Sequence, residues 1–327
     1  MGGSTLRLHL LSGRDVRAAV GMPRAIDVMA ETFGTLSAGE AEIPLRLRLP
    51  ATAGSILLMP AFLPGRQQLG AKLVSVFDGN PARGLPAISA LMILLDAATG
   101  QPLAVLEGAE LTALRTGAAS GLATRLLAPE DAGVVALFGA GVQARTQLEA
   151  VRAVRSVREV RVVARSLASA QAFVAGLEDV PTRALRDPQA ALADADLIIT
   201  ATSSAQPVFP GRAVEAGAHI NAIGAYTPEM RELDGELIRR SALVVDSRAA
   251  ALAEAGDVIL ALRAGLITET HIRAELGEIV NGTAEGRRTA AEITVFKSVG
   301  VALQDLALAR EALTRAEALG LGTVVEL

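Results

Sequence analysis

The sequence predicts an α/β protein built from two domains. Its 327 residues are about twice the usual length of one domain. The composition, 51% hydrophobic and 20% charged, is typical of a folded globular chain. The first part of the chain mixes helical spacing with short apolar runs, as in an α+β domain. Beyond Pro129, continuous apolar runs alternate with helical segments, as in a doubly wound parallel sheet.

The elements before Pro129 predict helices that flank a sheet. Ser12 and the Met22-Pro23 pair mark helix starts. Short apolar runs bounded by Gly, Pro and Asn predict strands at Leu57 to Met59, Leu73 to Phe77 and Leu91 to Leu95. The segment from Leu111 to Leu127 is rich in Ala, Leu and Thr, and we interpret it as a helix that ends before Pro129.

The elements after Pro129 predict the parallel sheet. Its expected strands are Val134 to Phe138, Val160 to Ala164, Leu197 to Ala201, Ala218 to Ile223 and Leu243 to Val245. A last long helix, Val299 to Leu319, is expected to pack back onto the first domain. We therefore expect one domain from residues 1–118 with 301–327, and a second from residues 119–300.

A glycine-rich loop follows the first of these strands. The strand ends at Phe138 and runs into Gly139-Ala140-Gly141-Val142-Gln143-Ala144, after which Arg145 to Val154 has helical character. In this setting Gly139 permits the tight turn, Gly141 lets the backbone approach a pyrophosphate, and Ala144 allows close packing of helix on strand. The pattern predicts a Rossmann-type nucleotide-binding domain. The alternative is a tight turn of an unrelated α/β domain.

The next strand indicates which dinucleotide is bound. NAD sites usually carry a carboxylate at the end of this strand, where it binds the ribose 2'-hydroxyl. The 2'-phosphate of NADP needs a cation at that place. Here Arg165 and Ser166 follow the strand, and Glu159 precedes it. These residues favour NADP(H) over NAD(H), unless Arg165 only stacks on adenine or faces solvent. Val142, Gln143 and Thr202, which follows the strand ending at Ala201, complete the expected cofactor contacts.

Composition argues against several other classes of partner. A net charge of −4 and 2% aromatic residues give no basis for nucleic-acid binding. The longest uncharged stretch, Leu49 to Gly65, contains three prolines and is shorter than the roughly 20 residues of a membrane span. With no cysteine, no secretory pattern at the N-terminus and three scattered histidines, we expect a cytoplasmic protein without a metal site.

Cations in the first domain are candidates for binding a substrate carboxylate. Arg46, Arg48, Lys72 and Arg115 each lie beside an apolar or Gly/Pro-rich segment. Several cations that converge on one cleft would hold a carboxylate, and Arg can do so through two hydrogen bonds. Convergence is not visible in a sequence, so each of them can equally be a solvated charge.

Ordered matches along nearly the whole chain resemble one family, the ornithine cyclodeaminase and mu-crystallin family. The matching segments are Pro44-Leu45-Arg46, Met59-Pro60-Ala61, Lys72-Leu73-Val74, Leu114-Arg115-Thr116-Gly117-Ala118, Gly139 to Ala144, Gly217-Ala218-His219-Ile220-Asn221, Arg231-Glu232-Leu233-Asp234 and Thr294-Val295-Phe296-Lys297-Ser298. The resemblance implies a homodimer. Its N-terminal domain, completed by the last helix, would supply the dimer sheet and the substrate cleft.

The resemblance also implies roles for single residues. Arg46, Lys72 and Arg115 correspond to the carboxylate-binding cations, whereas Arg48 matches no such position and is interpreted as a solvated charge. Thr116 and the glycine loop would lie against the cofactor. Lys297 and Ser298 stand in a segment that would approach the nicotinamide.

Two departures from the family pattern bear on the reaction. Cyclodeaminase and alanine dehydrogenase members carry an Asp where this chain has Tyr226, and cyclodeaminases carry a Glu where it has Leu57. A distal ammonium would therefore lie unpaired beside an apolar side chain. Asp234 and Glu229, nearby in sequence, remain possible substitutes.

The resulting hypothesis is NAD(P)H-dependent reduction of the C=N bond of (cyclic) 2-imino acids to L-amino acids. Lys72 and Tyr226 are the candidate proton donors, and Leu57 and Met59 are candidate pocket walls. The alternatives are an ornithine or lysine cyclodeaminase, an alanine dehydrogenase, and a non-catalytic, crystallin-like ligand-binding protein.

Overall fold

The computed structural model describes residues 6–77, 79–177 and 179–327. They form two compact units, one from the chain up to Arg115 together with Val301–Leu327, the other from Thr116–Gly300. The chain passes from the first unit to the second inside helix α3 (Gly108–Leu127). This boundary lies slightly before the one expected after Ala118. The doubly wound class with an α+β partner domain is confirmed by the two sheets described next.

The first unit contains a mixed sheet. Its strands are β1 (Arg7–Leu11), β2 (Leu47–Ala51), β3 (Gly54–Leu63), β4 (Gln68–Val76), β5 (Ile88–Asp96), β6 (Pro102–Glu107) and β15 (Thr323–Glu326). In the described part of the chain they are ordered β15-β1-β6-β5-β4-β3-β2, antiparallel except for the parallel pair β1 and β6. Short 3-10 segments lie at Pro64–Arg66 and Asn80–Arg83. Strands β3, β4 and β5 confirm the three predicted apolar runs.

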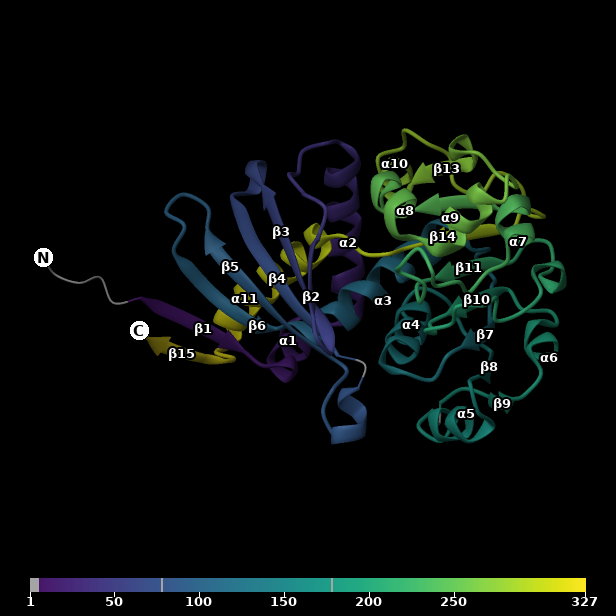
Figure 1. Ribbon diagram of the computed structural model, residues 1–327, viewed down its shortest axis with the longest axis horizontal. Coiled ribbons are helices and arrows are strands. Elements are labelled where there is room, and N and C mark those ends of the chain that lie inside the picture. The colour runs from purple at the N-terminus through teal and green to yellow at the C-terminus, as the bar shows by residue number, and fades with distance from the viewer. Residues whose placement is uncertain (1–5, 78, 178) are drawn as a thin grey trace, which may run out of the picture. The chain divides into compact units, whose positions relative to one another are not determined.

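Helices cover one face of this sheet. They are α1 (Gly13–Ala19), α2 (Met22–Ser37) and α11 (Ala302–Leu319). Ser12 starts α1 as predicted, because its hydroxyl accepts from the Asp15 amide while the Asp15 carboxylate accepts from the Ser12 amide. Figure 1 shows α11, in yellow, lying along the sheet, where it packs on α1, α2 and strands β3 to β5. The chain end thus completes the core of the first unit.

Strand register assigns side chains to the two faces. Lys72 on β4 pairs with Met59 on β3 and Met92 on β5, so these side chains point to the same face. A methyl group at Gly70 on this face would lie 3.1 Å from the Leu306 side chain of α11. The face of Lys72 is therefore the helix-covered, inner face.

The outer face carries exposed leucines. They form a row in register across four strands, consisting of Leu47, Leu58, Leu73 and Leu91. Their side chains are 63%, 40%, 39% and 46% exposed, respectively. A sheet face this apolar is unusual on an isolated protein.

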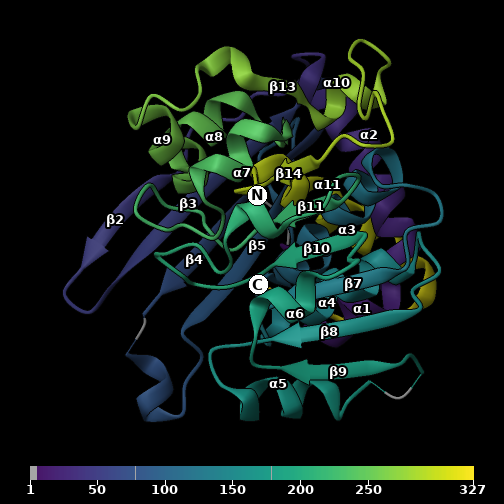
Figure 2. The same cartoon turned by 90° about the vertical axis from the view of Figure 1, so that its right-hand side faces the viewer.

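The second unit contains the parallel sheet. Its strands are β7 (Val134–Phe138), β8 (Glu159–Val163), β9 (Thr182–Leu185), β10 (Leu197–Thr200), β11 (His219–Ala222), β12 (Ala242–Val245), β13 (Ile272–Glu275) and β14 (Thr294–Lys297). Across the described residues the order is β13-β12-β14-β11-β10-β7-β8-β9, with every pair parallel. Figure 2 shows β9, β8, β7 and β10 side by side. The strand order reverses between β7 and β10, and such switch points are where this fold binds ligands.

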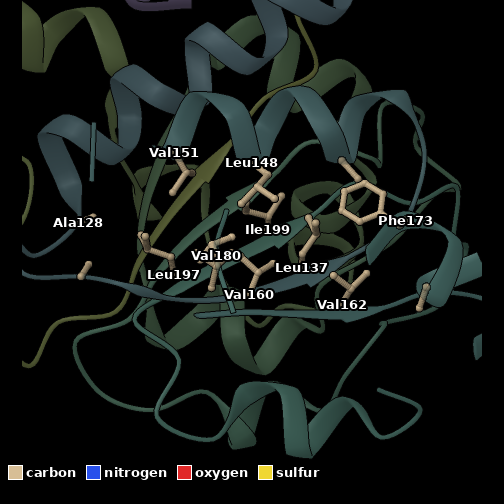
Figure 3. Close-up of a cluster of buried hydrophobic side chains, with 14 residues drawn as sticks. Ala128, Leu137, Leu148, Val151, Val160, Val162, Phe173, Val180, Leu197 and Ile199 are labelled. Carbon is tan, nitrogen blue, oxygen red and sulfur yellow. The ribbon is translucent and has the colours of Figure 1, made fainter. Parts of the chain in front are cut away.

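Helices and apolar side chains complete this unit. The helices are α4 (Val142–Arg152), α5 (Leu167–Val174), α6 (Pro188–Leu192), α7 (Gly235–Arg240), α8 (Arg248–Glu254), α9 (Gly256–Arg263) and α10 (Leu276–Val280), with 3-10 segments at Gly211–Ala213 and Glu269–His271. In Figure 3, Leu148 of α4 packs over Leu137, Val160 and Ile199 of the sheet. No helix among the described residues is both long and apolar enough to cross a bilayer.

Candidate active site

Two of the predicted cations meet at a buried carboxylate in the first unit. The Lys72 Nζ donates to Asp305 Oδ2 at 2.7 Å, and the Arg115 Nε donates to Asp305 Oδ1 at 3.2 Å. Lys72 is 2% exposed, Arg115 6% and Asp305 0%. The three residues come from β4, α3 and α11, so only the folded unit brings them together.

Further hydrogen bonds fix the orientation of both cations. The Lys72 Nζ also donates to the Thr112 hydroxyl at 3.3 Å, and Arg115 Nη1 donates to the Gln304 side-chain oxygen at 2.6 Å. Two cations against one carboxylate leave a charge of +1 on the Lys72–Arg115–Asp305 cluster. An unbalanced charge at such depth is costly unless an anion balances it. The cluster is therefore suited to bind an anionic ligand.

Burial and neighbouring charges set the protonation of this cluster. Burial lowers the pKa of Lys72 to about 8, against the opposing attraction of Asp305, and the charges of Arg115 and Arg46 lower it further. Burial alone would raise the pKa of Asp305, but Arg115 and Lys72 hold it below its ordinary value. The carboxylate is thus charged at neutral pH, and the Lys72 ammonium titrates near neutrality.

The other predicted substrate residues of the first unit lie near Lys72. Arg46 is half-buried just before β2, close enough for its charge to act on Lys72. Met59 is buried directly opposite Lys72 on β3, and Leu57 lies two residues earlier on the same face, half-buried. The structure therefore brings Arg46, Lys72 and Arg115 to one region of the unit, with two apolar side chains next to them.

The glycine loop of the second unit has the shape that a pyrophosphate needs. Gly139 has a φ of +124°, and a methyl group there would lie 2.4 Å from the Ala201 carbonyl oxygen. Gly141 precedes α4 without any side-chain cap, and a methyl group added to it would meet open space. Val142 is 68% exposed, while Ala144 is fully buried against the strand. The first amides of α4 can therefore receive an anion, and the residues fit a dinucleotide.

Residues at the end of β8 occupy different environments. Arg165 is exposed. The Ser166 hydroxyl accepts from the Ser169 amide at 3.1 Å and so caps α5. The Arg145 guanidinium, in the first turn of α4, lies over the Phe173 ring at 4.8 Å. Of the two predicted phosphate-binding residues, Ser166 already has a structural role, whereas Arg165 presents its charge to solvent.

A buried glutamate organises the ends of β10 and β11. Glu232 accepts from the Thr202 amide at 2.6 Å and hydroxyl at 2.8 Å, and from the Gly224 amide at 2.7 Å. The Thr200 hydroxyl and the Ala225 amide donate to it as well. Burial raises the pKa of Glu232, although the charge of Lys297 opposes this. Glu232 thereby fixes Thr202 and the turn that leads to Tyr226, which is 38% exposed.

The predicted nicotinamide-side residues are bound to internal carboxylates. Lys297 is fully buried, with its Nζ 3.0 Å from Asp257 Oδ2. The Ser298 hydroxyl donates to Asp246 Oδ2 at 2.8 Å. Asp257 also accepts from the backbone amide of Glu232. These buried contacts fix the position of the segment that follows β14.

Thr116 and the histidines complete the predicted positions. The Thr116 carbonyl accepts from Gln147 Nε2 at 3.1 Å, which ties α3 to α4. His219 is fully buried between Thr294 and Asn221, and burial lowers its pKa to about 3, so it is a neutral core residue. In the part of the chain that the structure describes, no three His, Asp or Glu residues are placed to hold a metal ion.

Sequence reasoning missed the carboxylates of both units. Asp305, Glu232 and Asp257 are each 0% exposed and accept hydrogen bonds that position predicted site residues. One signal was available for Asp305. Gln304-Asp305 is a polar pair among apolar residues near the start of the last helix, and a buried polar pair needs partners.

Comparisons with known proteins agree with this geometry. A profile of the ornithine cyclodeaminase/mu-crystallin family matches residues 8–319. A Δ1-pyrroline-2-carboxylate reductase of Bacillus cereus is 36% identical over 323 residues, covering 97% of this chain and 99% of the relative. The solved structure of the Δ1-pyrroline-2-carboxylate reductase of Thermococcus litoralis, in complex with NADH and L-proline, is 40% identical, with a TM-score of 0.93 and coverage of 96% and 99%.

An archaeal alanine dehydrogenase dimer with bound NAD is also similar in structure. It is 35% identical, with a TM-score of 0.92, and the match covers 98% of this chain and 99% of the dehydrogenase. The profile match and both reductases extend over nearly the full length of the sequence. The chain is a member of the ornithine cyclodeaminase/mu-crystallin family.

Proposed function

We propose that this protein is an NAD(P)H-dependent oxidoreductase that reduces the C=N bond of 2-imino acids to L-amino acids. Cyclic substrates such as pyrroline-2-carboxylate or piperideine-2-carboxylate fall in this class. The observation that carries the proposal is the buried Lys72–Arg115–Asp305 cluster with its surplus positive charge. The carboxylate of an imino acid would balance that charge through charge-assisted hydrogen bonds.

Substrate orientation is the first contribution of these residues. Asp305 and Thr112 hold the Lys72 ammonium, while Asp305 and Gln304 hold the Arg115 guanidinium. A carboxylate bound to cations fixed in this way has few orientations available. The imino carbon next to it is then presented in one direction, which lowers the entropic part of the barrier.

Proton supply is the second contribution. An iminium carbon is already electrophilic, so no carboxylate base is needed to deprotonate an amine, consistent with Tyr226 and Leu57 at positions where other members carry acids. We assign the proton donor to Lys72, whose pKa of about 8 lets it release a proton near neutral pH. The Tyr226 hydroxyl is the second candidate.

The cofactor would be held by the second unit. The backbone from Gly139 to Ala144 would cradle the pyrophosphate, with Thr116, Thr202, Lys297 and Ser298 shaping the remainder of the site. When bound, the nicotinamide supplies the hydride. We propose NADP(H) over NAD(H), because exposed Arg165 follows β8 and no carboxylate stands at that strand end. The cysteine-free chain suits a reducing compartment, and we propose the cytoplasm.

We also propose that the protein is a homodimer formed through the outer face of the first sheet. The occupant of this face would be a second copy, because a row of exposed leucines in register is self-complementary about a two-fold axis. The dimeric alanine dehydrogenase supports this proposal by its similarity.

The test is NADPH consumption in the presence of pyrroline-2-carboxylate, piperideine-2-carboxylate and open-chain 2-imino acids. Saturable consumption with formation of the L-amino acid is expected. Ammonia release from ornithine or lysine with catalytic NAD would indicate a cyclodeaminase. Preferential oxidation of alanine would indicate an alanine dehydrogenase. Saturable imine binding without turnover would indicate a ligand-binding protein.

A further inference from the structure

The inner face of the first sheet carries one more cation, Arg48. Arg48 on β2 pairs with Leu57 on β3, and Met59, two residues further on β3, pairs with Lys72 on β4. Paired residues, and residues two apart on one strand, project to the same face. Arg48 therefore shares a face with Leu57, Met59 and Lys72. Arg48 is exposed, as expected of a solvated charge, but the register places it on the strand face of Lys72.

Arg46 is a second arginine close to Lys72. It precedes Arg48 by two residues, and its charge acts on the pKa of buried Lys72. Arg48 lies two residues beyond Arg46, on the strand face that Leu57, Met59 and Lys72 share.

Charge on this face is strongly one-sided. The inner-face positions of β2, β3 and β4 contain no Asp or Glu. In the described part of the first unit, Asp305 is the one buried carboxylate beside Lys72 and Arg115. Arg48 is exposed, and it forms no ion pair with a carboxylate among the described residues. One substrate carboxylate would leave a positive surplus, and Arg48 is the cation furthest from the place where it would bind.

We propose that Arg48 forms a second anion subsite and that the preferred substrates are dicarboxylic 2-imino acids. This inference rests on the proposed function and specifies its substrate class. Arg48 and Lys72 lie two strands apart, and their positions differ by two residues along the strand direction. Together these offsets separate their Cα atoms by about 12 Å. Both side chains are long, so their charged ends can approach the two carboxylates of a four- or five-carbon acid. Leu57 and Met59 lie between them as an apolar surface for the carbon chain.

The chemistry of the step does not change with the second carboxylate. The C=N bond accepts a hydride at carbon from NAD(P)H and a proton at nitrogen, which gives the amino dicarboxylic acid and NAD(P)⁺. The distal carboxylate neither gains nor loses atoms. Its interaction with Arg48 changes affinity and orientation only.

Equilibrium binding tests the subsite without requiring turnover. Calorimetry of the full-length protein with 2-oxoglutarate and with 2-oxobutyrate compares a dicarboxylic with a monocarboxylic 2-oxo acid. The wild type is expected to bind the dicarboxylate about tenfold more tightly, the contribution of one charge-assisted hydrogen bond. Arg48→Gln should abolish most of this ratio and Arg48→Lys should retain part of it. Arg7→Gln, an exposed arginine on β1, serves as the matched control and should keep the wild-type ratio.

Initial rates with NADPH and ammonia then separate this inference from the proposed function. If no imine consumes NADPH, the proposed function fails, and the binding ratio still decides the subsite. Equal affinities for the two acids in the wild type overturn the subsite, as does an unchanged ratio in Arg48→Gln. A raised KM for NADPH in Arg48→Gln with an unchanged acid ratio would assign Arg48 to the cofactor and overturn the subsite as well.

Discussion

Lys72 and Asp305 are 233 residues apart in sequence and form a 2.7 Å ion pair in the core of the first unit. The pair joins β4 to α11, and Arg115 of α3 binds the other oxygen of the same carboxylate. The cations that would bind the substrate are thus held by an anion that the C-terminal helix supplies.

The first prediction concerns Asp305→Asn. The substitution leaves two buried cations without their counter-ion, so the free energy of unfolding should fall by about 3 to 5 kcal/mol. Urea denaturation measures the change. Glu236→Gln, which breaks only a surface pair with Arg239, is the control and should leave the midpoint nearly unchanged. Equal small effects for both variants would mean that Asp305 does not hold the cluster.

The second prediction is a pH dependence of ligand binding set by Lys72. Burial lowers the pKa of Lys72 to about 8, so its ammonium is present below that pH and is lost as the pH rises through it. The affinity for a 2-oxo acid, which does not titrate in this range, should therefore be constant below about pH 7 and weaken above pH 8. Calorimetry across this range measures it. Lys72→Arg stays charged and should remove the alkaline loss, so a loss that persists in Lys72→Arg would exclude Lys72 as its origin.

The third prediction concerns cofactor preference and Arg165. Arg165→Asp places a carboxylate where a ribose 2'-hydroxyl would bind and a 2'-phosphate would be repelled. The ratio of kcat/KM for NADPH over NADH should fall by about tenfold or more. Arg212→Asp introduces the same charge change at another exposed arginine of the second unit and should not alter the ratio. An unchanged ratio in Arg165→Asp would mean that Arg165 faces solvent in the complex.

The fourth prediction concerns the outer leucine row. Leu73→Asp adds a charge in the middle of the row at a side chain that is already 39% exposed, so the chain should still fold. Light scattering should show a change from a dimer to a species of 33.6 kDa. Leu266→Asp, on an equally exposed leucine of the second unit, should leave the dimer intact. A dimer that survives Leu73→Asp would place the interface elsewhere.

Apolar runs predicted part of each sheet. Strands β3 to β5 and β7, β8, β10, β11 and β12 were all found in this way. Strands β9 and β13 were missed because they are four-residue edge strands that include charged residues. Strand β14 is buried and as long as β10, β11 and β12, but Thr294 and Lys297 at its two ends leave only two apolar residues between them. Polar residues within short strands, together with edge position, limited the prediction of the fold.

Residue type made the glycine loop and several cations candidates for the site, and the family resemblance selected Lys72 and Arg115 among the cations. Neither indicated the carboxylates that bind these residues. Asp305 binds Lys72 and Arg115 from 233 and 190 residues away, and Glu232 binds Thr202 from 30 residues away. Such pairings depend on which helix packs on which strand, which local spacing does not encode. For the same reason, the position of Arg48 opposite Leu57 became apparent only from the strand register.

Glu232 makes two separate loops depend on one side chain. Because its carboxylate accepts from both Thr202 and Gly224, the segments after β10 and β11 cannot drift independently. A shift in one loop would therefore move the other loop, because both are bound to the buried Glu232 carboxylate. Substitutions around Tyr226 can therefore change the side chains at this turn while the two loop backbones keep their spacing.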